Sequence, residues 1–319
     1  AVDASLPSQL QKWLDHSLPD GCLLILAGSS TRMMHDLFLQ RAAPLYGRAT
    51  KLLNLQPMDY AAFCQACKQK ASEMESFEKF SCVGGIPKYW EFVEEGQDAV
   101  ALTESLYFDF APYMEQEPQR ILRDEGVTGL NAVAALEAVG RGAERPSEIA
   151  GRLGTAQTNL SRLLQQLLDA AILTRELPFG ESVRSTKKIL YRIQDPTMRF
   201  WFRVYSPHRS LWPTYAAAQK RKLIHEHAAT VFEDFCRARY PGAGRYWESN
   251  VELDLVAPDP EAPDDAQRLL VAEVKWRRLS VTERKNVLRQ LESKWSHCAL
   301  RARYPNVRFE ALDASILAD

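Results

Sequence analysis

Three charged residues interrupt two strand-like stretches near the end of the chain. Asp254 lies in RYWESNVELDLVA at 245–257, whereas Glu273 and Lys275 lie in LLVAEVKW at 269–276. Side chains alternate between the two faces of a strand, so Glu273 and Lys275 share one face. If the two stretches pair across the intervening loop, Asp254 meets Glu273. Two neighbouring carboxylates repel each other unless a cation or water separates them.

A divalent metal ion would account for this grouping. Mg²⁺ prefers carboxylate oxygens and leaves room for a phosphate, and a nearby lysine can orient or help deprotonate an attacking water. Glu233, in VFEDF, is a candidate third carboxylate on the preceding helix. We therefore predict phosphodiester hydrolysis by Asp254, Glu273, Lys275 and Glu233, with Mg²⁺ or Mn²⁺ at Asp254 and Glu273. The alternative is a sheet face held by cross-strand salt bridges.

The elements that would position these residues follow in a fixed order. A helix at 223–240 precedes the two strands, and a helix at 280–300 and a strand at 308–312 follow them. This order, with Glu233, Asp254 and the Glu273-Val274-Lys275 triplet, resembles the PD-(D/E)XK nuclease core. The resemblance implies that Asp254 and Glu273 ligate metal, that Lys275 acts as the water-positioning base and that Glu233 assists. No proline precedes Asp254, which departs from the family pattern.

Residues 128–195 predict a DNA-docking unit. Helices at 128–142, 145–154 and 155–173, followed by a hairpin of 174–179 and 187–195, have the outline of a winged helix-turn-helix. The helix at 155–169 would face DNA, and the hairpin adds a basic cluster. A packing role between domains is the alternative. The candidate nucleic-acid-binding residues are Gln157, Thr158, Asn159, Ser161, Arg162, Arg175, Arg184, Lys187, Lys188 and Arg192.

The front of the chain predicts one α/β unit. CLLILAG at 22–28 has the composition of a strand buried in a parallel sheet, between helices at 6–18 and from 31 onward. With LYGRATKLLNLQP, GGIP at 84–87 and the C-terminal motifs, the chain resembles prokaryotic AAA-type (STAND-like) ATPases that carry the domain of unknown function 234. The resemblance implies nucleotide contacts by Ser29, Ser30, Arg48, Gly85 and Pro87.

One departure from that family is large. Its members carry a phosphate-binding G-x-x-x-x-G-K-[ST] loop, and this pattern occurs nowhere in the sequence. The chain therefore resembles the C-terminal portion of such a protein, and we expect ATP binding only where the missing front half is present. ATP hydrolysis by this chain alone is not expected.

Composition limits the remaining options. The 319 residues have a net charge of −1 and 46% hydrophobic content, which fits a globular multidomain protein with only local basic surfaces. Neither a signal peptide nor a membrane-length apolar run is visible, so we expect a cytoplasmic protein without a membrane partner. Cys64-x-x-Cys67 with Cys82 lacks a fourth ligand for zinc, and buried thiols are the better interpretation.

Together these patterns predict a mixed α/β multidomain chain. The predicted domains are a partial P-loop ATPase core at 1–57, a helical lid at 58–125, a winged helix-turn-helix with connector at 126–222, and a restriction-endonuclease-like domain at 223–319. Two functions compete. One is a DNA-acting, Mg²⁺-dependent nuclease; the other is a catalytically inactive regulatory module that binds DNA or a partner protein, with homo-oligomerisation left open.

Overall fold

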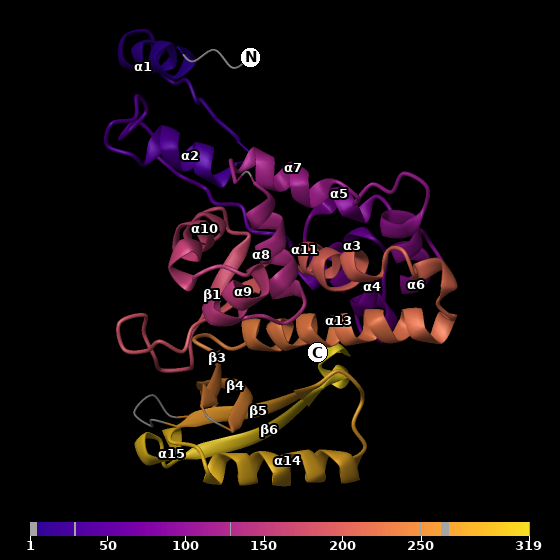
Figure 1. Ribbon diagram of the computed structural model, residues 1–319. Coiled ribbons are helices and arrows are strands. Elements are labelled where there is room, and N and C mark those ends of the chain that lie inside the picture. The colour runs from indigo at the N-terminus through magenta and orange to yellow at the C-terminus, as the bar shows by residue number, and fades with distance from the viewer. Residues whose placement is uncertain (1–4, 29, 128, 249, 263–267, 319) are drawn as a thin grey trace.

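The chain folds as a mixed α/β structure with a helical body and a C-terminal sheet (Figure 1). The computed structural model describes residues 5–28, 30–127, 129–248, 250–262 and 268–318. Its strands form a two-stranded sheet, β1–β2, and a four-stranded sheet in the order β3-β4-β5-β6. The fold class predicted from the sequence is therefore confirmed at the level of mixed α/β.

The apolar stretch at 22–28 does not form the predicted strand. It is extended, and the side chains of Leu23 and Ile25 are 79% and 77% exposed. In the described part of the chain no strand pairs with it. An apolar segment becomes a buried strand only when neighbouring strands form hydrogen bonds with its backbone N–H and C=O groups. Figure 1 shows the flanking helices standing away from the helical body. These are α1 (Leu6–His16) and α2 (Thr31–Phe38).

The helical body is built around aromatic side chains. The ring of Phe77 contacts that of Phe232 at 5.5 Å and that of Trp276 at 4.9 Å between centroids. Aromatic side chains bury large areas, so these contacts tie the body to the C-terminal elements. The body contains α3 (Tyr60–Ala66), α4 (Met74–Val83), α5 (Pro87–Trp90), α6 (Ala99–Thr103), the π-helix η1 (Glu104–Phe108) and α7 (Glu117–Asp124).

Three helices and a hairpin form the next part, here called the three-helix unit (residues 130–193). Leu160, Leu164 and Leu167 are buried at helical spacing, and strands β1 and β2 pair antiparallel. This confirms the predicted elements. The unit contains α8 (Leu130–Gly140), α9 (Pro146–Leu153), α10 (Gln157–Asp169), β1 (Leu173–Glu176) and β2 (Leu190–Ile193).

A helical connector leads to the longest helix. A Cβ atom at Gly140 would lie 2.6 Å from the Cβ of Phe202, so only glycine allows α8 to approach the connector so closely. The connector contains α11 (Pro196–Phe200), the π-helix η2 (Trp201–Tyr205), α12 (Ser206–His208) and η3 (Trp212–Thr214), and α13 (Ala217–Ala238) follows.

The C-terminal sheet lies between two helices. One apolar face packs toward α13 through Leu255 and Ala272, whereas the other packs on α14 through Val256 and Val271. β3–β4 and β4–β5 pair antiparallel, and α14 connects β5 to its parallel neighbour β6. The elements are β3 (Gly244–Glu248), β4 (Val251–Pro258), β5 (Leu269–Lys275), α14 (Val281–Ser296), α15 (Leu300–Arg303), β6 (Val307–Asp313) and η4 (Ala314–Ala318).

The stretch at 245–257 contains two strands rather than one. β3 and β4 form a hairpin whose register shifts between the pairs Gly244↔Val256 and Tyr246↔Leu253, which places one extra residue in β4. As a result Leu253 and Leu255 lie in different apolar clusters, instead of on the common face that simple alternation predicts. A β-bulge re-aims side chains in this way and often stands next to functional residues.

Candidate functional site

The predicted catalytic residues lie where β4 and β5 separate. The antiparallel ladder ends at the pair Leu255↔Ala272, although β4 begins at Val251 and β5 continues to Lys275. Asp254 and Glu273 are the next residues on the two strands. The backbone thus forms a fork, and we call the group of Asp254, Glu273 and Lys275 the fork site.

Asp254 is fixed at the fork by a backbone hydrogen bond. Its Oδ2 accepts the N–H of Val274 at 2.9 Å, which replaces the ladder hydrogen bond that would otherwise satisfy this donor. Burial, followed by the nearby carboxylates of Glu273 and Glu233, raises the pKa of Asp254 to about 6. The sequence prediction that Asp254 meets Glu273 is in keeping with this placement.

Glu273 is held by two lysines. Its Oε1 accepts a hydrogen bond from Lys275 Nζ and its Oε2 accepts one from Lys294 Nζ, both at 2.8 Å. Burial acts to raise the pKa of Glu273, but the two ammonium groups outweigh it and hold the pKa below its usual value. In turn Glu273 outweighs the effect of burial on Lys275 and raises its pKa, so Lys275 stays protonated.

Glu233 approaches the fork site from α13. Burial raises its pKa, although Arg237, 3.7 Å away, acts against this shift. Arg237 also donates to the backbone carbonyl of Asp254 at 2.9 Å. The helix therefore contributes a carboxylate and a guanidinium to the edge of the fork site.

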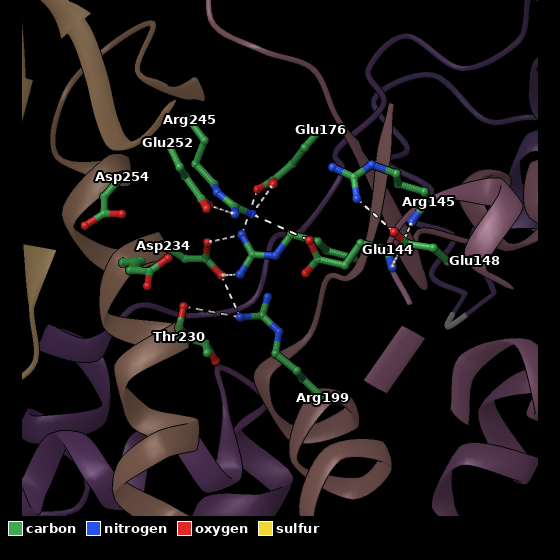
Figure 2. Close-up of polar contacts among 12 residues, drawn as sticks. Glu144, Arg145, Glu148, Glu176, Arg199, Thr230, Asp234, Arg245, Glu252 and Asp254 are labelled. Atoms are coloured by element: carbon green, nitrogen blue, oxygen red, sulfur yellow. Dashed lines mark hydrogen bonds and ion pairs between the residues drawn. The ribbon is translucent and has the colours of Figure 1, made fainter. Parts of the chain in front are cut away.

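A network of ion pairs centres on Asp234, the residue that follows Glu233 in α13 (Figure 2). Asp234 binds Arg199 at 2.7 Å and Arg192 at 3.0 Å, and it also pairs with Arg237. Burial acts to raise the pKa of Asp234, but the three guanidiniums hold it far below the usual value. Arg192 is therefore a buried structural residue, which corrects its assignment to a DNA-facing basic cluster.

The same network joins the three-helix unit to the C-terminal sheet. Glu176 in β1 accepts from Arg192 at 2.7 Å and from Arg245 in β3 at 3.0 Å, and Arg245 also binds Glu252 in β4. Sequence reasoning missed this group, because its members lie on six separate elements and each looks locally like an ordinary surface charge.

The candidate nucleic-acid-binding residues lie on the surface of the three-helix unit. The α10 candidates Gln157, Thr158, Asn159, Ser161 and Arg162 are all exposed, as are Lys187 and Lys188. Gln157, Lys187 and Lys188 also line a cleft of about 770 Å³ between this unit and strands β3 and β4. The exposed groups are therefore accessible to a phosphate backbone. Arg175, by contrast, lies over the ring of Tyr191.

The residues proposed to face nucleotide make separate structural contacts. Ser30 caps α2 by accepting the N–H of Met33. Arg48 forms a two-pronged ion pair with Asp15, at 2.7 and 2.8 Å. The carbonyl of Gly85 accepts the N–H of Met58, and Pro87 starts α5. In the described ranges no hydrogen bond or ion pair joins these four residues to one another, and Ser29 lies outside those ranges.

The three cysteines considered for a zinc site are buried or half-buried. Cys64 and Cys82 are buried and Cys67 is half-buried, and burial raises the pKa of all three. Among the residues that the structure describes, no group of three or more His, Cys, Asp or Glu is placed to hold a metal ion. That finding applies to the fork site as well as to these cysteines.

Among the residues that the structure describes, no helix is long and apolar enough to cross a membrane.

Comparison with known proteins finds one family model that matches part of the chain. Residues 201–287 match the DUF234 family, described as "Archaea bacterial proteins of unknown function". The chain is also 27% identical over 297 residues to the uncharacterized protein MJECL04 of Methanocaldococcus jannaschii, covering 85% of this chain. The match spans 63% of that relative's length. No solved structure matches the chain. The family match includes Glu233, Asp254, Glu273 and Lys275.

Proposed function

We propose that the chain docks on DNA through a winged helix-turn-helix formed by the three-helix unit and hydrolyses phosphodiester bonds at the fork site. In this proposal residues 223–319 form a restriction-endonuclease-like, PD-(D/E)XK domain. Its support is an α13-β3-β4-β5-α14-α15-β6 order around one sheet, with Asp254 and the Glu273-Val274-Lys275 triplet meeting at the fork. The observation that carries the proposal is the hydrogen bond from Val274 N–H to the carboxylate of Asp254.

The donor set fits a divalent cation in charge and chemical type. Asp254, Glu273 and Glu233 are three carboxylates whose mutual repulsion contributes to the raised pKa of Asp254. A cation would relieve that repulsion. The side chains do not form a finished cage, because Glu273 gives both oxygens to lysines. Mg²⁺ or Mn²⁺ binding at Asp254 and Glu273 therefore requires Glu273 to exchange a lysine for the metal.

The residues of the fork site then have distinct tasks. A divalent cation bound there supplies Lewis-acid chemistry at the phosphodiester. Lys275, kept protonated by Glu273, donates hydrogen bonds that orient the attacking water and stabilise charge on the phosphate. The raised pKa of Lys275 argues against the role of proton-accepting base that the sequence suggested. Glu233, with its raised pKa, is the better candidate to hold or accept a proton beside the site.

A cleavage assay tests this proposal. The purified chain is incubated with single-stranded, double-stranded and branched DNA in Mg²⁺, Mn²⁺ or EDTA, beside Asp254→Asn and Lys275→Met. We expect metal-dependent cleavage that falls by about 10²-fold or more in either variant, the scale of one catalytic group. Glu292→Gln, which changes an exposed acid on α14, should cleave normally.

A non-catalytic DNA-docking module is the second candidate function. The observation that favours it is the saturation of Glu273 by Lys275 and Lys294, which leaves the carboxylate neutralised without a metal. DNA binding that persists in EDTA, with no cleavage of any substrate in Mg²⁺ or Mn²⁺, would support this function. It would also reject the nuclease.

A further inference from the structure

Lys294 is a cation at the fork site that belongs to none of the sequence motifs considered above. It comes from α14, whereas Lys275 comes from β5, and both bind the same carboxylate. The side chain of Glu273 is 12% exposed, whereas that of Lys294 is 39% exposed. One end of this ion pair is therefore fixed inside the sheet, and the other can move into solvent.

The packing of α14 explains why Lys294 reaches the site. Leu291 and Trp295 are buried against the sheet, so the intervening Lys294 lies at the border of the apolar stripe. Its aliphatic stem can follow the helix surface while the ammonium extends to Glu273. Lys294 also lies in the last turn of α14, where a cation is favourable beside the free carbonyl groups. A released Lys294 side chain thus keeps a favourable position.

The charges at the fork site balance without a metal. The carboxylates of Glu233, Asp254 and Glu273 face the cations Arg237, Lys275 and Lys294. Arg237 also pairs with Asp234. The ammonium of Lys275 is attracted by the carboxylates of Asp254 and Glu233 as well as by Glu273. Lys294 makes its one described ion pair with Glu273. It is the cation that can leave at least cost.

We infer that Lys294 is an internal counter-cation that occupies Glu273 Oε2 and must withdraw before a divalent metal can bind there. A divalent cation and an ammonium on the same carboxylate repel each other, so their binding is competitive. Lys294 thereby lowers the metal affinity of the site and keeps Glu273 ordered when metal is absent. The inference rests on the proposed metal site at Asp254 and Glu273.

Metal titration of Lys294→Met tests the inference directly. The variant keeps the length and apolar stem of the side chain but removes its charge. By titration calorimetry of the full chain we expect Mn²⁺ to bind about tenfold tighter than in the unmodified protein, which corresponds to one lost competing ion pair. Lys285→Met changes an exposed lysine on the same helix and should leave the affinity unchanged. Adding Glu273→Gln to Lys294→Met should remove the gain.

A second measurement uses the unmodified protein and does not depend on the folding of any variant. Lysine acetylation is followed by mass spectrometry with and without Mg²⁺. Release from Glu273 should speed acetylation of Lys294 when Mg²⁺ binds, whereas Lys285 should react at the same rate in both conditions. Slower or unchanged labelling of Lys294 at saturating Mg²⁺ would overturn the inference.

The outcomes separate the inference from the function on which it rests. If Mn²⁺ binds through Asp254 but Lys294→Met binds it no tighter, the inference is wrong and the nuclease proposal stands. If Lys294→Met has unchanged metal affinity and weaker DNA cleavage, Lys294 contacts substrate and the inference is again wrong. If neither protein binds Mn²⁺ or Mg²⁺, both the proposed metal site and the role of Lys294 are rejected.

Discussion

The carboxylate of Asp254 accepts the backbone N–H of Val274 at 2.9 Å, between Glu273 and Lys275. One hydrogen bond thus brings together acids that are 19 residues apart in the sequence. It forms because the β4–β5 ladder ends at the pair Leu255↔Ala272, two residues before Val274, and leaves this N–H without a partner on β4. Where the ladder ends, the two strands separate, and the polar side chains of the fork site lie between them.

Replacing Asp254 by Asn should stabilise the metal-free protein above pH 6. The pKa of Asp254 is about 6 in the folded chain, against roughly 3.9 when unfolded, so ionisation disfavours folding. The penalty is absent below pH 4, grows as the pH rises to 6 and is complete above it. Asn keeps an oxygen for Val274 N–H and removes the charge. We expect a gain of about 1–3 kcal/mol at pH 7.5, vanishing toward pH 4.

Urea unfolding in EDTA at several pH values measures this difference. Glu292→Gln provides an exposed carboxylate control and should follow the unmodified protein at every pH. A stability gain for Asp254→Asn that did not depend on pH would assign the effect to packing instead of charge. Loss of an ionisation penalty together with loss of cleavage is the usual exchange of stability for function at an active site.

The acids of the fork site were predictable because their signal is local. Asp254, Glu273 and Lys275 interrupt apolar strands, and period-two alternation fixes which of them share a face. The β-bulge in β4 was not predictable in this way, since it arises from pairing with β3. Lys294 was also missed, because its ion pair depends on how α14 lies across the sheet.

The strand predicted at 22–28 shows the limit of composition as a signal. CLLILAG has the residues of a buried strand, but composition does not reveal whether partner strands exist. In the described structure the segment is extended and exposed. Arg192 was misassigned for a related reason: its charge was visible in the sequence, whereas its burial against Glu176 and Asp234 was not.

Replacing Asp234 by Asn should weaken the junction between α13 and the three-helix unit. Its carboxylate faces Arg192, Arg199 and Arg237, so the neutral variant leaves three guanidiniums without their shared partner. Its side chain is about one-third open to solvent, which screens part of the effect. We expect a loss of about 1–2 kcal/mol at pH 7, between the values for exposed and buried pairs.

The lowered pKa of Asp234 determines how this loss of stability depends on pH. The pKa of Asp234 is lowered on folding, so its stabilisation is present above the unfolded value and disappears as the pH falls through the folded one. The difference between Asp234→Asn and the unmodified protein should therefore shrink in strong acid. Urea unfolding in steps from pH 7 to pH 2 measures it, and the difference should stay constant down to about pH 4 and decline below it, with Asp20→Asn as an exposed control. Equal stability at pH 7 would show that the network contributes nothing net.

Removing Lys187 and Lys188 should weaken DNA binding in a salt-dependent manner. Both side chains are exposed on the hairpin and line the cleft beside β3 and β4. Each lysine that neutralises a phosphate contributes about 0.9 to the slope of log affinity against log salt. The double change to Gln should lower that slope by about 2.

Fluorescence anisotropy of labelled duplex DNA over a range of KCl concentrations measures the slope. The double change Lys51→Gln with Lys285→Gln removes the same charge from other elements and should have little effect. An equal loss in the two double variants would indicate a non-specific charge effect. An unchanged slope after loss of Lys187 and Lys188 would remove the hairpin from the proposed DNA surface.

Alanine at Gly85 should destabilise the helical body, whereas alanine at Gly151 should stabilise α9. A Cβ at Gly85 would lie 2.2 Å from the carbonyl oxygen of Met58, a backbone atom that cannot move aside cheaply, so we expect a loss of about 1–3 kcal/mol from overpacking.

Gly151 lies inside α9 with nothing within 4 Å of an added Cβ, and helical alanine is favoured by roughly 0.5–1 kcal/mol. Thermal unfolding without nucleotide should therefore shift in opposite directions. A Gly85→Ala protein of normal stability would remove the packing explanation and return Gly85 to the residues available for a ligand.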